Sequence, residues 1–536
     1  MKARTLFGTA YLHLAVWRIL LVLVGFLILI QTSEGNNGPF LSPTLWMMRG
    51  GATPKTRGSK QDNVYKLLAK ALIGNFEDVD DKSELSKAFE RLSTSQQAFK
   101  GLDGAAHEVY QRTHAGDDID ISVVGRAQRS AARTAATAEA LLACELIELV
   151  QSPDVTSNET LRNRKVLLNI TTESGVVTMG KGNLSVLVLW EEKYTGGAGL
   201  DHGNIEHLTD EIIHSPRQLR RPRGRLLIIL GDPFANDLVK TLQVLDQSPQ
   251  RVKLSSGLVI GEVVSVQSTL YGTAGSLLKE LEPILRSHNA SAVHFVGSSL
   301  AGGVASLAAC IFDGTLPMPK RGKASKKRSG SKRKTPSDES TIADIDAGNK
   351  TMGNNETEVL QPLDGLGRGR SSALTLGAPP CLSSNILAAY CTSFMYGDDI
   401  VCRTSRDSIQ RLCKRAHTNI HGGIIGRNVG WMADALSLTV SNLKTHAHGS
   451  EGEEAKLSVP GRAYLLRPRR LGGVCSIHEV GSLKKGGREA LRAGLLWQLN
   501  DILLSKSMWK HHFLDSYIHG LDRVQLRGID NEEDYY

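Results

Sequence analysis

The segment VHFVGSSLAGGVASLAA, around Ser299, constrains the fold of this chain more than any other part of the sequence. An apolar strand leads through a short run of small residues directly into an apolar helix. The central residue of such a turn has a strained backbone, and the residues two before and two after it must be small so that strand and helix can pass each other. Gly297 and Ala301 occupy these two places. The segment therefore predicts that Ser299 is a nucleophile on a strand-to-helix elbow.

A glycine-rich turn that is merely tight, or one that binds phosphate, is the competing interpretation of this segment. The chain contains no GxxxxGK[ST] pattern, which disfavours a phosphate-binding P-loop. The helix that follows Ser299 points its N-terminus at the turn, where its dipole and its unpaired N–H groups would stabilise an oxyanion.

Strand and helix patterns alternate through the C-terminal two thirds of the chain. KVLLNIT and SVLVLWEE predict a strand pair, and GRLLIILGD predicts a buried strand that ends in Gly231. Helical patterns follow in NDLVKTLQVL and TAGSLLKELEPILRS, and the alternation continues after the elbow in ALTLGAP, SFMYGDD and DSIQRLCKRA. This order predicts an α/β fold with a mainly parallel central sheet flanked by helices on both faces. In such sheets the chemistry lies at the carboxyl ends of the strands.

Residues 1–35 predict a signal peptide or a signal anchor. Basic residues precede the apolar run Ile19–Ile30, whose twelve residues match a signal-peptide h-region and are few for a membrane span. Ser33 and Gly35 suit cleavage, whereas an uncleaved anchor would carry Arg18 inside it. Residues 36–60 lack acidic side chains, as a linker or a transit peptide would. We therefore expect the secretory pathway, which six glycosylation sequons also fit, or a plastid reached by a bipartite signal.

Three further regions complete the predicted organisation. Residues 61–150 are rich in helix formers and predict an N-terminal helical region ahead of the α/β domain at 160–525. An insert within that domain, at 315–371, has almost no apolar content and predicts disorder. Residues 526–536 form an acidic tail.

The formal net charge of +9 is concentrated in the insert, where nine lysines and arginines lie between Lys320 and Lys334. Since the rest of the chain is close to neutral, no nucleic-acid-binding surface is expected. The basic run predicts either a solvated loop or a contact with anionic lipid. Seven cysteines without C-x-x-C spacing predict neither a zinc module nor a disulfide-dense scaffold, although one or two disulfides stay open. We expect no metal and no cofactor.

Several segments together resemble the class 3 lipase (fungal lipase-like) family. GSSLAGGVASLA is similar to its GHSLGGALA elbow, with Ser298 in place of the histidine and Ala301 in place of a glycine. ALTLGAPPCLS and PGRAYLLRPRR resemble two of its strands. FMYGDDIVCRTS resembles its V-x-G-x-D-x-V-P-R-L segment, in a register that selects Asp399 and puts Cys402 where proline is usual. WKHHFLDSYIHGLDRV resembles its D-H-x(4)-Y segment and supplies His512. The resemblance covers 160–525 and is nearest to sn-1-specific diacylglycerol lipases, which carry a comparable insert.

The resemblance implies an α/β-hydrolase fold and a carboxylic ester hydrolase that acts on a glycerolipid at a membrane surface. Ser299 would attack the ester carbonyl, His512 would take up its proton and later release it, and Asp399 would orient the imidazole. The order Ser–Asp–His along the chain is that of α/β-hydrolases. In the histidine segment, Tyr517 takes the place of the family's tyrosine and His511 replaces its aspartate.

The predicted oxyanion donors are the backbone N–H groups of Leu300 and Asp232. The family has arginine-glycine-Ser/Thr where this chain has Leu230-Gly231-Asp232. A carboxylate beside a developing oxyanion is unfavourable unless it points away or is protonated. With its side chain turned out, Asp232 could still donate its backbone N–H. The alternative is a catalytically weak or inactive lipase-fold protein that binds lipid or acts as a scaffold.

Overall fold

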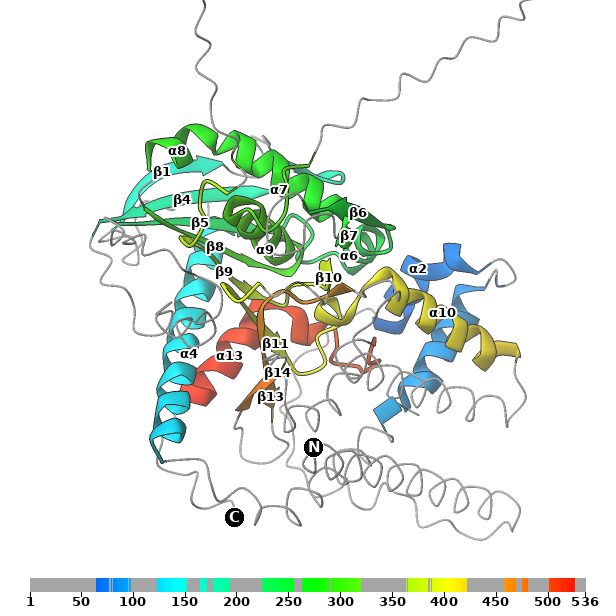
Figure 1. Ribbon diagram of the computed structural model, residues 1–536. Helices are drawn as coiled ribbons and strands as arrows, with labels where there is room; N and C mark the ends of the chain where they lie inside the picture. The colour runs from blue at the N-terminus through cyan, green and yellow to red at the C-terminus, as the bar shows by residue number, and fades with distance from the viewer. Residues whose placement is uncertain are drawn as a thin grey trace, which may run out of the picture.

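An eight-stranded mixed sheet forms the centre of the protein (Figure 1). The computed structural model describes residues 64–97, 123–151, 164–170, 177–192, 224–254, 263–288, 291–319, 363–421, 457–468, 475–480 and 501–525, with short gaps in the first range and in 363–421. In spatial order, the strands are β1 (Lys165–Ile170), β4 (Ser185–Glu191), β5 (Arg225–Gly231), β8 (Ala292–Ser298), β9 (Ser371–Leu376), β11 (Cys391–Tyr396), β13 (Arg462–Pro468) and β14 (Cys475–Val480).

The five central strands are parallel to one another, from β5 through β8, β9 and β11 to β13. The outer pairs are antiparallel: β1 with β4, β4 with β5, and β13 with β14. The predicted α/β arrangement is therefore confirmed as a mixed, mostly parallel sheet flanked by helices. The predicted strand pair of KVLLNIT and SVLVLWEE corresponds to β1 and β4.

Helices cover both faces of this sheet, as Figure 1 shows. α9 (Ser299–Asp313) packs on β8 and β9 with α7 (Ser268–Glu280) against it, while α4 (Val123–Gln151) and α13 (Leu514–Gln525) lie on the opposite face. β5 is buried along its whole length because its alternate side chains serve the two cores. Leu226, Ile228 and Leu230 join the α9 side, and Leu227 and Ile229 join the α4 side.

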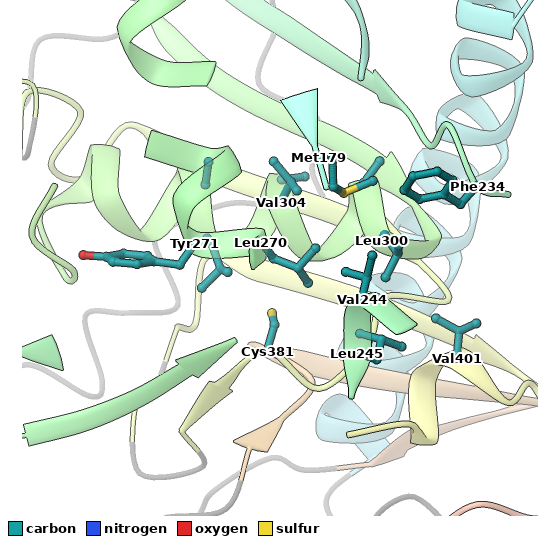
Figure 2. Packing of buried hydrophobic residues seen from close by; sticks show 14 of the residues in the cluster. Met179, Phe234, Val244, Leu245, Leu270, Tyr271, Leu300, Val304, Cys381 and Val401 are labelled. Carbon is teal, nitrogen blue, oxygen red and sulfur yellow. The ribbon is translucent and has the colours of Figure 1, made fainter. Parts of the chain in front are cut away.

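The core on the α9 side fixes the helix that follows the elbow. Figure 2 shows Leu300 and Val304 of α9 among Leu270 and Tyr271 of α7 and Val244 of α6 (Leu238–Leu245). Almost every residue of α9 is buried, so the helix is apolar all round rather than amphipathic. A helix packed on all sides keeps its first turn in place, and this first turn begins at Ser299.

The helix predicted from TAGSLLKELEPILRS is interrupted at Leu281. α7 ends there and α8 (Glu282–Ser287) begins, with Pro283 in its first turn. Proline has no N–H to continue the preceding helix and is well tolerated in the first turn of the next one, which explains the break.

A second, four-stranded antiparallel sheet has the order β12 (Leu457–Ser458), β10 (Leu382–Ser383), β7 (Val263–Gln267), β6 (Pro249–Lys253). The remaining elements are α2 (Val64–Leu72), η2 (Ile73–Asn75), a helical stretch over 82–94, the hairpin β2 (Thr178–Met179) and β3 (Gly182–Asn183), η6 (Val401–Arg403), α10 (Arg406–His421) and η7 (Lys510–His512). The N-terminal helices contact the rest of the fold, since α2 packs against α6 and α4 packs against the sheet.

Several predicted regions lie outside the described residues. These are the signal or anchor at 1–35, the linker at 36–60, residues 320–362 of the insert with its basic run, and the tail at 526–536. Within the part of the chain that the structure describes, no helix combines the length and the apolar character needed to cross a bilayer.

Candidate active site

The carboxyl ends of β5, β8, β9 and β11 meet at one edge of the sheet. Leu230 lies beside Gly297, Ser298 beside Leu376, and Leu376 beside Phe394. The residues that directly follow these strands are therefore neighbours in space although they are far apart in sequence. Asp232, Ser299 and Asp399 all come from these strand ends, as the predicted fold requires.

Ser299 lies on a strained turn between β8 and α9. Its φ is +56°, and within the described residues it is the one non-glycine residue with a positive φ. A Cβ on Gly297 would come within 2.7 Å of the Ala301 carbonyl oxygen, so the strand and helix pass too closely for any other residue at 297. The elbow predicted from the sequence therefore has the backbone that its spacing implied.

A continuous chain of hydrogen bonds joins Ser299, His512 and Asp399. The His512 Nε2 atom lies 2.9 Å from Ser299 Oγ, and its Nδ1 atom lies 2.9 and 3.1 Å from the two Asp399 carboxylate oxygens. All three side chains are buried. The structure thus brings together the three residues that the sequence singled out, in the order a base and its orienting carboxylate require.

Asp399, rather than the adjacent Asp398, contacts the imidazole. The Asp399 carboxylate also accepts a hydrogen bond of 2.6 Å from the Tyr517 hydroxyl and one of 2.8 Å from the Val401 N–H. Burial raises the pKa of Tyr517 well above its usual value, so the phenol stays a donor. The Asp398 N–H, by contrast, donates to His511 Nδ1 at 3.0 Å. His511 therefore supports the turn instead of reaching the nucleophile.

Two residues that hold the histidine were not predicted from the sequence. Gly377, with φ +64°, has no side chain, so the Asp399 carboxylate and the His512 imidazole can lie close to its backbone. A Cβ at this position would lie 2.7 Å from Asp399 Oδ2 and 3.4 Å from His512 Nδ1. The Trp509 indole stacks on the His512 ring with 5.1 Å between centroids. The glycine in ALTLGAP was a visible signal for the first, because a glycine directly after a strand often marks a close approach. No sequence pattern announces the tryptophan.

Of the two possibilities that the sequence left open for Asp232, the side chain does not take the one in which it points away. Its Oδ2 atom accepts a hydrogen bond of 3.0 Å from the Leu300 N–H, and its Oδ1 atom accepts one of 2.7 Å from the Phe234 N–H. The Ser299 hydroxyl lies near the same carboxyl group and influences its pKa. The predicted Leu300 donor is therefore engaged by the Asp232 side chain. The turn itself causes this, since an aspartate that accepts the N–H two residues later is held close to its own backbone.

Burial dominates the electrostatics of Asp232. The side chain is removed from water, which raises the pKa of its carboxyl group above the ordinary value. The nearby Ser299 hydroxyl, the hydrogen bonds from Phe234 and Leu300, and the nearby His512 act in the opposite direction but do not reverse this shift. The protonated form of the Asp232 carboxyl group is therefore favoured more than the protonated form of a solvated aspartate.

Other chemistry-bearing residues serve the core. His294 is buried on β8 and hydrogen-bonded to the Ser372 hydroxyl at 2.7 Å, and burial lowers its pKa to about 3. All seven cysteines are buried thiols, so the disulfides that the sequence left open are not formed in this structure. Among the residues described, no group of histidine, cysteine and carboxylate side chains has the arrangement of a metal site.

Comparison with known proteins leaves the family open. No family model matches the chain, and no curated protein matches it. Among solved structures, the chain is similar to the native Rhizomucor miehei lipase propeptide complex, with 10% identity and a TM-score of 0.29 over 70% of this chain and 81% of that one. A deletion mutant of the same complex matches with 10% identity and a TM-score of 0.29, over 70% and 78% of the two chains.

Proposed function

We propose that this protein is a serine hydrolase of carboxylic esters, with a glycerolipid as its substrate at a membrane surface. The observation that carries the proposal is the hydrogen-bonded chain from Ser299 Oγ through the His512 imidazole to the Asp399 carboxylate. A strained elbow presents the serine, and a base lies within direct reach of it. The glycerolipid substrate, and in particular diacylglycerol, rests on the resemblance of the sequence to class 3 lipases.

In the proposed reaction, Ser299 Oγ attacks the ester carbonyl while His512 Nε2 takes the hydroxyl proton. The carbonyl oxygen becomes an oxyanion at the N-terminus of α9, next to the Leu300 N–H. His512 then gives the proton to the departing alcohol, which leaves an acyl group on Ser299. Water, deprotonated by the same imidazole, releases the fatty acid and restores the serine. Asp399 holds the imidazole with Nδ1 protonated throughout.

Labelling with a fluorophosphonate tests the nucleophile. The wild-type chain and the Ser298→Ala variant should be labelled, and the Ser299→Ala variant should not. The adjacent serine is a matched control, since it changes one hydroxyl at the same turn. Hydrolysis of a short p-nitrophenyl ester and of a diacylglycerol emulsion should be lost with the label. Equal slow hydrolysis by the wild type and by Ser299→Ala would contradict the proposal.

A second candidate function is lipid binding or scaffolding without turnover. One observation favours it: the Asp232 carboxyl group occupies the Leu300 N–H that an oxyanion would need. Such a protein would bind diacylglycerol vesicles equally well as wild type and as Ser299→Ala, and neither form would release fatty acid. Vesicle flotation and fatty-acid release, measured on the same two proteins, separate the two functions.

The cellular setting is proposed on sequence grounds. We place the chain in the secretory pathway, with a plastid as the alternative, and assign Lys320–Lys334 a contact with anionic lipid. A fusion of residues 1–60 to a fluorescent protein reports the destination. Binding to phosphatidylserine vesicles, compared between wild type and a variant with the basic residues of this run replaced by glutamine, reports the lipid contact. Because the contact is electrostatic, added salt should weaken the wild-type binding.

A further inference from the structure

The Asp232 carboxyl group lies where the reacting oxygen of an ester has to lie. An oxyanion donor acts at a distance of about 2.7–3.1 Å, measured to the position of the oxyanion. Asp232 Oδ2 already lies 3.0 Å from the Leu300 N–H. In this position the side chain resembles the carboxylate of a bound product. A substrate oxygen can reach the Leu300 N–H only if Oδ2 moves aside.

The far side of the same carboxyl group is anchored. Oδ1 accepts the Phe234 N–H at 2.7 Å, within the turn that Asp232 itself begins. A small rotation about this anchor releases Leu300 and leaves Oδ2 at the rim of the oxyanion position. There Oδ2 will lie next to the substrate oxygen. The protonation state of the carboxyl group decides whether Oδ2 attracts or repels that oxygen. An ionised oxygen offers only lone pairs, whereas a protonated oxygen donates a hydrogen bond.

The surroundings of Asp232 supply little to neutralise a negative charge. In the described part of the chain, the titratable group that faces it is the His512 imidazole from η7, with Asp399 behind that ring. From α9 it meets the Ser299 hydroxyl and the Leu300 N–H. Its neighbour Gly231 packs against Val150 of α4 and Ser185 of β4. The nearest other carboxyl in the turn, Asp237, is 39% exposed and pairs with Lys240.

We propose that Asp232 is a further catalytic residue, which donates a hydrogen bond from its neutral carboxyl group to the oxyanion and blocks the oxyanion hole when ionised. This inference rests on the proposed ester hydrolysis. The acid proton stays on Asp232 during the reaction, and His512 alone transfers the proton of Ser299. One side chain thereby acts as donor in one protonation state and as a competitor of the substrate in the other.

A characteristic pH dependence follows. Burial raises the pKa of Asp232, so the donating form persists above the pH at which a solvated aspartate would ionise. Activity should fall as the pH rises through this pKa, because the ionised form occupies the hole. The wild type should therefore lose activity toward alkaline pH, and a variant without this carboxyl group should not.

The test compares the full-length wild type with Asp232→Asn. Asparagine keeps an oxygen for the Phe234 N–H and offers an N–H in place of Oδ2, without a charge at any pH. Asp237→Asn is the matched control, because it removes one negative charge from the same turn outside the oxyanion hole. The value of kcat/KM for p-nitrophenyl butyrate is measured from about pH 5 to pH 9 at the isosbestic wavelength of the product. The rate of fluorophosphonate labelling is measured in parallel.

For the wild type and Asp237→Asn, kcat/KM should fall together on the alkaline side. For Asp232→Asn, kcat/KM should rise to a plateau and exceed the wild-type value at the alkaline end by about a hundredfold, the contribution of one oxyanion donor. If the pH profiles of wild type and Asp232→Asn are superimposed and both proteins are active, the role of Asp232 is overturned and the proposed hydrolase stays intact. The same conclusion follows if Asp232→Asn folds but is inactive while the wild type is active. Absence of hydrolysis and of labelling from all three folded proteins at every pH would refute the proposed function itself.

Discussion

Two buried carboxyl groups belong to the site around Ser299, and their surroundings differ. Asp399 binds an imidazole, a phenol and one backbone N–H, all of which are donors placed by η7, α13 and the turn after β11. Asp232 accepts hydrogen bonds from two backbone N–H groups, one of which belongs to the residue after Ser299. The first carboxyl group is separated from the reacting atoms by the ring of His512. The second lies among the reacting atoms, and any charge on it is felt by the substrate.

This difference teaches that burial alone does not define the role of a carboxyl group. A carboxylate surrounded by fixed donors orients its partner and keeps the same task at every working pH. A carboxyl group at the oxyanion position changes from donor to acceptor when it ionises. Two aspartates in one site can therefore contribute in opposite ways, and each variant below alters one side of Ser299.

The largest effect is expected from Asp399→Asn. The amide cannot hold the imidazole in the tautomer that accepts the Ser299 proton, and the loss in kcat should be about 10⁴-fold. Asp398→Asn is the control, since it removes the neighbouring carboxylate, and it should retain most of the activity. Comparable losses from both variants would show that the site depends on local charge and not on the contact with His512.

Gly377→Ala should disturb the Asp399 side without changing any charge. The new Cβ would lie 2.7 Å from Asp399 Oδ2 and require a left-handed backbone at φ +64°. A displacement of the imidazole by about 1 Å should lower kcat/KM by about a hundredfold. Thermal unfolding checks that the protein folds. Full activity in a folded variant would show that the Asp399 carboxylate tolerates another position.

Tyr517→Phe should have a smaller effect on the same side. It removes the hydroxyl that donates to Asp399. In the wild type the Tyr396 N–H donates to the Tyr517 oxygen at 3.1 Å, and in the variant this N–H loses that acceptor. The free energy of unfolding should fall by about 1–3 kcal/mol, and kcat/KM by about tenfold. Urea unfolding and steady-state kinetics measure the two quantities. Unchanged stability would mean that this buried N–H finds another acceptor.

Asp232→Asn should have the smallest effect, which is a gain in the free energy of unfolding rather than a loss. Because burial raises the pKa of Asp232 in the folded state, the contribution of this group to stability is greatest at low pH and falls between its unfolded-state pKa and its raised folded-state pKa. The asparagine variant lacks this loss, so its stability relative to the wild type should rise over that pH interval. Urea unfolding from about pH 4 upward would show the gap widening and then levelling off; a gap that is constant from pH 4 upward would argue against a raised pKa.

The sequence predicts the backbone of the site better than its electrostatics. A strand-to-helix elbow demands small residues at fixed spacing, so Gly297, Ser299 and Ala301 are visible in a single segment. Asp399 and His512 were selected by resemblance, and the structure brings them to Ser299. Their catalytic role remains a prediction. The orientation of the Asp232 side chain could not be predicted, because it depends on a turn geometry and on burial that no local pattern encodes.

The fold, like the site, could be predicted from the sequence only in part. Alternating apolar segments were sufficient for a mostly parallel sheet with helices on both faces, since periodicity reflects which faces are buried. The break between α7 and α8 was missed, although Pro283 was visible, because the apolar pattern runs through it. Trp509 was missed because its stacking on His512 depends on the tertiary structure.

The distance along the chain between Ser299 and His512 also determines when a new molecule becomes able to react. Their side chains meet across 213 residues. At ordinary rates of synthesis, of about 5–20 residues per second, roughly 10–40 seconds separate the two residues during translation. The segment that leads to His512 must then also return to the start of the fold, where the Leu504 N–H donates to Gln96 across 408 residues. An unfinished chain therefore carries Ser299 without the imidazole beside it, and the hydrogen-bonded chain of the site cannot form before the segment that contains His512 has been made.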